Sequence, residues 1–102
     1  MDRELVPQKS FEALAHRFRV LGEAHRLMIL NELYAHGERS VQELVEATGL
    51  RQPNLSKHLH ALTEAGLVRR RREGTRVFYR LDAPELPGLC LLAFAPLDGA
   101  ST

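Results

Sequence analysis

One stretch, residues 51–81, limits most strongly what this chain can fold into. Its first half carries a leucine stripe at the i, i+4 and i+7 spacing of one helical face, made of Leu55, Leu59 and Leu62. Gly66 follows the stripe, and glycine often ends a helix because it enters the left-handed conformation without a Cβ clash. The pattern therefore predicts a helix over 53–65 that stops sharply at this glycine.

The second half of the stretch reads as two short strands. Residues 67–72 and 76–81 flank the loop Glu73-Gly74-Thr75, and a short glycine-containing loop of this kind is typical of a β-hairpin. The sequence therefore predicts a helix that is followed directly by a hairpin.

Positive charge is concentrated in the same stretch. Residues 51–80 carry a net charge of +6, although the whole chain carries only +1 and everything outside the stretch sums to −5. A basic patch on a nearly neutral protein is the electrostatic footprint expected for binding a polyanion, most simply nucleic acid.

The residues before this stretch predict three further helices. Apolar spacing favours helices over 9–21 and 24–35, and the second has apolar residues on more than one side, which predicts that it is the most buried. Ser40 and Glu43 have the spacing of a capping box, which predicts a third helix that begins after Ser40.

The predicted fold class is mainly α with a β-hairpin, in the order α-α-α-α-β-β-α. Helix, short glycine-containing turn and helix make a helix-turn-helix, and the hairpin after it is a wing. The length of 102 residues predicts one domain. We expect a flexible arm at 1–8, the winged helix-turn-helix at 9–82, and a dimerisation helix and tail at 83–102.

Polar residues near the start of the second helix of the helix-turn-helix are the predicted DNA contacts, because that end lies nearest the base edges. The candidates on or beside this helix are Arg51, Gln52, Asn54, Ser56, Lys57, His58 and His60. The alternative is that they form only the solvated face of an amphipathic helix. Gln and Asn suit adenine, and Lys or Arg suit guanine.

Four arginines in a row make the wing the second part of the predicted DNA surface. Residues alternate between the two faces of a strand, so only one pair of the four is expected to face the duplex. The candidates are Arg70, Arg72 and Arg76, and the two beside the wing tip, Arg72 and Arg76, are predicted to be the best placed.

These motifs resemble the ArsR/SmtB family of bacterial winged-helix repressors over about residues 11–81. The resemblance rests on the string S-x-H-L-x-x-L-x-x-A-G-L-V, which begins at Ser56, and on the wing pattern R-x-G-x-x-V-x-Y, which begins at Arg72. It implies a homodimer built mainly from the first and last helices, binding to a palindromic operator, and release by an effector.

The metal sites of that family are not carried over to this chain. Its arsenic and cadmium sensors place cysteines on the helix before the recognition helix, which here reads VQELVEA. Its zinc and nickel sensors place ligands on the last helix, and residues 83–102 contain no histidine. No metal and no cofactor is predicted, although an atypical site between subunits, using His16, His25 or His36 with Asp2 or Glu4, is left open.

Apolar residues at both ends of the chain are the predicted dimer interface. They are Phe11, Leu14, Phe18, Leu89, Cys90, Leu92 and Phe94. A domain already closed by the hairpin leaves such residues without an internal partner. Cys90, the one cysteine, excludes an intrachain disulfide, and it is interpreted as a small interface residue with a redox role as the alternative.

These patterns predict a DNA-binding transcriptional repressor. A winged-helix module for protein contacts is the alternative, since fold does not fix function. An enzyme is not predicted, because the sequence lacks a glycine-rich phosphate loop and a recognisable catalytic constellation. The N-terminus lacks a secretory signal and no apolar run is long enough to cross a membrane, so a cytoplasmic location is expected. The effector and the operator sequence are not indicated.

Overall fold

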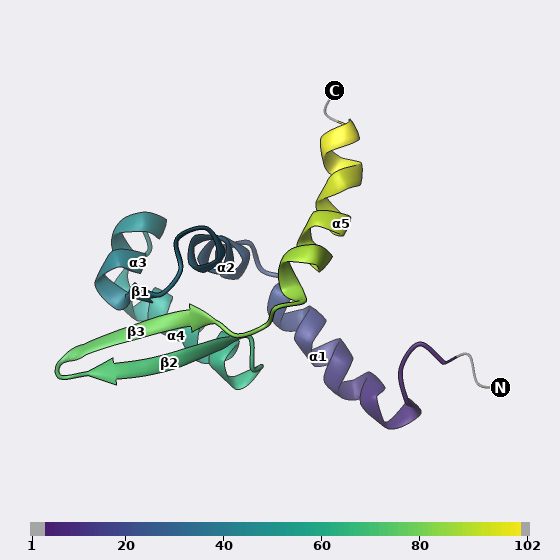
Figure 1. Ribbon diagram of the computed structural model, residues 1–102, viewed down its shortest axis with the longest axis horizontal. Helices are drawn as coiled ribbons and strands as arrows, with labels where there is room; N and C mark the ends of the chain where they lie inside the picture. The colour runs from purple at the N-terminus through teal and green to yellow at the C-terminus, as the bar shows by residue number, and fades with distance from the viewer. Residues whose placement is uncertain (1–3, 101–102) are drawn as a thin grey trace.

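The computed structural model describes the backbone of residues 4–100 and the side chains of residues 4–97 (Figure 1). Its elements, in chain order, are η1 (Gln8–Ser10), α1 (Phe11–Leu21), α2 (Ala24–His36), β1 (Arg39–Ser40), α3 (Val41–Thr48), α4 (Gln52–Glu64), β2 (Val68–Glu73), β3 (Arg76–Leu81) and α5 (Leu86–Ala100). The predicted order α-α-α-α-β-β-α is confirmed, with a 3₁₀ turn and a short strand added.

The added strand, β1, turns the predicted hairpin into a three-stranded antiparallel sheet of order β1-β3-β2. It has two residues, with Arg39 opposite Tyr79 and Ser40 opposite Phe78. A two-residue strand has no period that a sequence pattern can reveal. β1 nevertheless ties the start of α3 to the wing.

The wing loop is shorter than the sequence predicted. Glu73 pairs with Arg76 in the register of β2 and β3, so the loop contains only Gly74 and Thr75. Gly74 has a φ of 62°, the positive value that a tight two-residue hairpin needs at such a position. The prediction that Glu73 belongs to the loop is therefore wrong.

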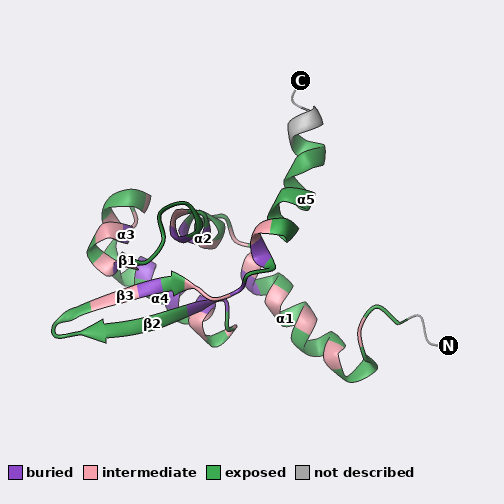
Figure 2. Cartoon of the chain, viewed as in Figure 1, coloured by how far each residue is buried: buried purple, intermediate pink, exposed green. Residues whose placement is uncertain are grey.

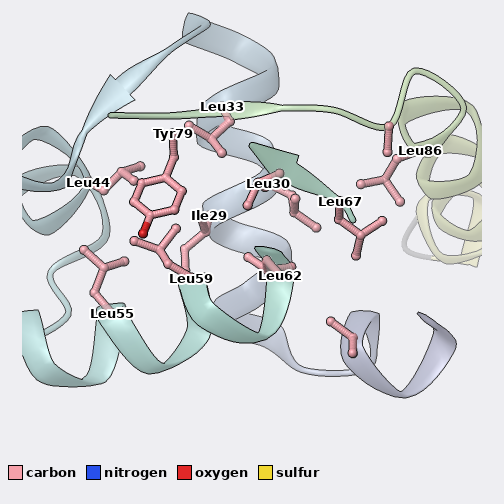
Figure 3. Packing of buried hydrophobic residues seen from close by; sticks show 13 residues of the cluster. Ile29, Leu30, Leu33, Leu44, Leu55, Leu59, Leu62, Leu67, Tyr79 and Leu86 are labelled. Atoms are coloured by element: carbon pink, nitrogen blue, oxygen red, sulfur yellow. The ribbon is translucent and has the colours of Figure 1, made fainter. Parts of the chain in front are cut away.

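The core forms where the leucine stripe of α4 meets α2, α3 and β3 (Figure 3). Leu55, Leu59 and Leu62 are at most 1% exposed. In the close-up Leu59 lies beside Ile29 of α2 and the Tyr79 ring of β3, Leu55 lies below Leu44 of α3, and Leu62 lies below Leu30 of α2. Complete burial of a leucine contributes roughly 1.5–3 kcal/mol, so this stripe fixes the rotation of α4 about its own axis.

The prediction that the second helix is the most buried is wrong. α2 buries three residues, Ile29, Leu30 and Leu33, whereas α4 buries four. Leu27 and Met28 remain 40% and 47% exposed, because one side of α2 faces away from the sheet and from α4. Part of its apolar surface is therefore available for other contacts.

The turn between α3 and α4 is closed by local hydrogen bonds. Ser40 Oγ accepts from the Glu43 amide at 3.1 Å and Glu43 Oε1 accepts from the Ser40 amide at 2.8 Å, so the predicted capping box is confirmed. Gly49 ends α3 in the left-handed region with a φ of 73°. Its amide donates to the Val45 carbonyl at 2.9 Å, and α4 begins three residues later.

α1 and α5 project from this body away from the wing tip and are largely exposed (Figures 1 and 2). α5 nevertheless begins inside the core, since its first residue, Leu86, is 4% exposed, and Ala83 in the preceding connection is 2% exposed. The division at 1–8, 9–82 and 83–102 stays a prediction, and residues 1–3 and 101–102 lie outside the described part. Within that part, no helix is both long and apolar enough to cross a membrane.

The left-handed turn predicts a specific order of stabilities at position 49. Gly49→Ala should lower the free energy of unfolding by about 1–2 kcal/mol, because a Cβ is strained at a positive φ. No atom lies within 4 Å of the added Cβ, so the cost is one of backbone conformation alone. Gly49→Asn should cost less, because Asn tolerates this region. Urea denaturation at fixed protein concentration measures both, and equal losses would contradict the assigned turn.

Candidate nucleic-acid interface

The outward side of α4 carries most of the predicted DNA contacts. The exposed candidates on or beside this helix are Arg51, Gln52, Asn54, Ser56, Lys57 and His60. They are exposed because the leucine stripe occupies the opposite side of the helix. Lys57 and His60 are three residues apart and therefore share one part of this face.

A groove of about 410 Å³ separates α4 from the wing. Gln52 and Ser56, one helical turn apart, line it on the α4 side, and Arg70 and Arg76 line it on the wing side. The start of α3 closes the groove with Ser40, Val41 and Gln42. The structure thus brings predicted residues from the helix and from the hairpin to one surface.

The register of the wing separates its arginines between two faces. Arg70 lies opposite Tyr79 and Arg72 opposite Val77, and directly paired residues point to the same side of a sheet. Tyr79 is buried in the core, so this face is turned towards the helices. Arg69 and Arg71 belong to the other face, as strand alternation predicted.

Two arginines of that other face, Arg69 and Arg71, are held by carboxylates. Arg69 Nε donates to Asp82 Oδ2 at 3.2 Å. Arg71 donates to Glu38 at 2.8 Å and to Glu73 at 2.7 Å, and its guanidinium lies 4.6 Å from the Phe78 ring centroid. The hydrogen bond from Arg71 lowers the pKa of Glu38, which keeps the pair ionised near neutral pH. The charges of Arg69 and Arg71 are therefore neutralised within the protein, whereas Arg76, which the register places on the same face, forms no ion pair within the described residues.

The three arginines predicted to contact DNA are not held in this way. Within the described residues, Arg70, Arg72 and Arg76 form no ion pair. Arg72 Nε donates to the Gly74 carbonyl at 3.3 Å, and Arg76 lies 4.9 Å from the Phe78 ring centroid. Arg72 and Arg76 were predicted to be the best placed, but of these two only Arg76 lines the groove. The third candidate, Arg70, also lines the groove.

His58 does not share the exposed surface, and the prediction that it contacts DNA is wrong. It is 7% exposed and faces α2 from the inner side of α4. Arg26 Nε donates to its Nδ1 at 3.2 Å, and its Nε2 lies 3.5 Å from Glu23 Oε2. Burial lowers its pKa, so the ring is neutral near pH 7.

Sequence reasoning missed two residues of this region. Gln42 lines the groove from the first turn of α3, a position that its exposed polar side chain after the capping box could have suggested. Glu38 holds Arg71 across 33 positions of sequence, and no local pattern carries that signal. The groove is therefore a product of tertiary structure.

A second surface consists of exposed apolar side chains on α1 and α5. Of the predicted interface, Phe11, Phe18, Leu89, Leu92 and Phe94 are between 39% and 76% exposed, Cys90 is also exposed, and Leu14 is half-buried. α5 and α2 also border an apolar groove of about 490 Å³ that includes Leu27, Tyr34 and Phe94. Contiguous apolar surface of this kind marks an interaction site.

The chain is similar in sequence to known regulators. Residues 23–76 match the model of the MarR family. The chain is 49% identical over 65 residues to the HTH-type transcriptional regulator KmtR of Mycobacterium tuberculosis, a match that covers 64% of this chain and 49% of that protein. It is 36% identical over 88 residues to a probable mercury resistance operon repressor of Streptomyces lividans, with 86% and 70% covered.

A solved structure extends the likeness to almost the whole chain. The homodimeric winged helix-turn-helix DNA-binding domain of a possible ArsR-family regulator from Mycobacterium bovis superposes with a TM-score of 0.77 at 34% identity, covering 95% of this chain and 91% of that one. The chain spans half or less of the length of two matched Mycobacterium tuberculosis regulators, 49% of one and 35% of the other. The resemblance to ArsR-type repressors is confirmed.

Proposed function

Because the chain belongs to the winged helix-turn-helix transcriptional regulators of the MarR and ArsR families, we propose that it is a repressor that binds double-stranded DNA as a homodimer. α4 acts as the recognition helix in the major groove, and the hairpin of β2 and β3 contacts the adjoining backbone. An effector, whose chemistry the fold does not specify, releases the operator.

One observation carries this proposal most strongly, namely the division of the wing arginines. Arg69 and Arg71 are already paired with carboxylates, so they gain little from a phosphate. Arg70 is unpaired among the described residues and lines the groove beside Gln52 and Ser56 of α4. Free cations beside a polar helix face provide both phosphate attraction and base contacts.

The polar residues of α4 supply the proposed sequence readout. Gln52 and Asn54 lie in the first turn, the part of a recognition helix that approaches base edges, and their amides suit adenine. Lys57 suits guanine or a phosphate. Arg51, Ser56 and His60 complete the proposed contact surface of the helix.

Dimerisation through α1 and α5 presents two copies of this contact surface to the DNA. Their exposed apolar residues are the surface that a second copy is proposed to cover, and a two-fold dimer buries the same patch on both subunits. Two α4 helices then lie about one duplex turn apart, roughly 34–36 Å, and read a palindrome.

The wing predicts a difference between two arginine variants of equal charge. Arg70→Ala should weaken DNA binding on all sequences and reduce the salt slope by about one per protomer, because one phosphate contact is lost. Arg69→Ala removes the same charge from the face that is paired with Asp82, so its slope should stay near that of the wild type. Fluorescence anisotropy over a salt series measures both. Equal slopes for the two variants would contradict the proposed face.

We expect Gln52→Ala to change sequence discrimination, unlike Arg70→Ala, which changes the salt slope. Loss of a bidentate amide contact should reduce discrimination at one base of each half-site by about 1–3 kcal/mol, with little change in the salt slope. Competition binding on operator variants with one changed base pair measures this loss, and Gln8→Ala, outside the groove, is the control. An equal loss of affinity for all operator variants would instead show that Gln52 contacts the DNA backbone.

The apolar surface predicts that one charge on α5 separates the subunits. Leu92, which is 76% exposed, can be replaced by Glu without disturbing the core, but the carboxylate would be buried in a dimer at high cost. Leu92→Glu should therefore be a folded monomer by circular dichroism and sedimentation equilibrium, with weakened operator binding. Leu5→Glu, at a position 90% exposed outside both helices, should remain dimeric. A dimeric Leu92→Glu protein would exclude this face.

A further inference from the structure

We propose that Glu23, His25 and His58 form a binding site for a divalent first-row transition metal such as Zn²⁺. The site lies where the N-terminus of α2 meets the inner side of α4. Glu23 is the N-cap of α2, His25 lies in its first turn, and His58 comes from α4. The sequence separates the two histidines by 33 positions, so no local ligand spacing reveals the site.

The three side chains already stand close to the separations that a metal requires. His25 Nδ1 lies 3.4 Å from Glu23 Oε1, and His58 Nε2 lies 3.5 Å from Glu23 Oε2. Ligands about 2.0–2.1 Å from a tetrahedral ion stand about 3.3–3.4 Å apart. One ligand atom from each residue lies within 4.8 Å of the others, and the two imidazole centroids are 5.8 Å apart. Both distances to Glu23 therefore match the span between ligands of one ion, and side-chain rotation would have to bring the two imidazole nitrogens together.

The donor set fits a transition metal better than Ca²⁺ or Mg²⁺. Two imidazoles and one carboxylate suit Zn²⁺ and its neighbours, whereas the hard cations prefer oxygen ligands. Burial lowers the pKa of His58, so its ring is in the neutral form that metals bind. Burial raises the pKa of Glu23, but the amides of His25 and Arg26 outweigh it and lower the pKa, which keeps the carboxylate charged. Three protein ligands leave one position for water.

Arg26 is the group that competes with the metal. Its Nε–H donates to His58 Nδ1 at 3.2 Å, so the neutral ring carries its proton on Nε2, the atom that faces Glu23. A metal on Nε2 moves that proton to Nδ1, which then meets the Arg26 donor. Arg26 must therefore release His58 when the metal binds, and its positive charge opposes the ion until it does.

Occupancy of this site would cross-link two elements of the DNA-binding unit. The metal would join the start of α2 to α4, the helix proposed to read the operator, and would fix their relative position. This consequence rests on the proposed function. The metal site itself does not, because its ligands lie on the inner side of α4, away from the groove.

Titration of the full, tag-free, chelator-treated chain with Co²⁺ in the absence of DNA tests the proposal. The wild type should bind one equivalent per chain with the intense visible bands of a low-coordinate Co²⁺ site, and Zn²⁺ should displace it. His25→Gln and Glu23→Gln should each weaken binding by more than about tenfold. Both positions are solvent-accessible, and the Gln at position 23 retains an oxygen for the helix cap, so both variants should fold.

His36→Gln is the matched control, because it removes an exposed histidine that lies 3.5 Å from a different carboxylate, Glu32. It should bind Co²⁺ like the wild type. The proposal is overturned if the wild type binds no stoichiometric Co²⁺, or if His25→Gln and Glu23→Gln bind it unchanged. Neither result depends on DNA binding, so the metal-site proposal can be overturned without overturning the proposed function.

Arg26→Gln tests the competition directly. It removes the opposing charge and supplies an amide oxygen that can accept from a protonated Nδ1 of His58. Its affinity for Co²⁺ should therefore exceed that of the wild type. A lower affinity would contradict the placement of the metal on His58 Nε2.

Discussion

The burial of one face of α4 is the constraint on which the rest of the structure depends. Leu55, Leu59 and Leu62 are sealed against α2, α3 and β3. Rotation of the helix by even a quarter turn would expose them, at a cost of several kcal/mol. Because this face is fixed, the opposite face with Lys57 and His60 is fixed as well. The direction in which the protein presents its polar residues thus follows from hydrophobic packing.

The wing obeys a second constraint of the same kind. Val68 and Tyr79 must face the core, and the period of two then decides which arginines share their side. Arg70 lies on the same face as Tyr79 and lines the groove. Arg69 and Arg71 lie on the opposite face. There Asp82 pairs with Arg69, and Glu38 and Glu73 pair with Arg71. A run of four identical residues therefore yields two chemically different pairs: Arg69 and Arg71 are held by carboxylates, whereas Arg70 and Arg72 form no ion pair within the described residues.

The sequence was informative wherever a local pattern carries the structure. The capping box at Ser40, the glycine stop at Gly66 and the alternation of the wing all have short-range physical causes, and the structure has them as predicted. The errors arise where partners come from far away. His58 occupies a polar position on a helix that reads as exposed, but Arg26 and Glu23, more than 30 residues earlier, satisfy its ring and allow its burial. The cluster of Glu23, His25 and His58 was missed for the same reason, because His58 lies 33 positions after His25. β1 was missed because a strand of two residues has no sequence pattern.

The central claim is that the protein meets DNA with the groove between α4 and the wing, which Arg70 and Arg76 line. Side-chain NMR of the arginine Nε–H groups, recorded with and without a duplex that carries the operator, tests it most directly. The account predicts large shifts for Arg70 and Arg76 and small shifts for Arg69 and Arg71, which keep their carboxylate partners. Large shifts at Arg69 and Arg71 with an unchanged Arg70 would contradict it.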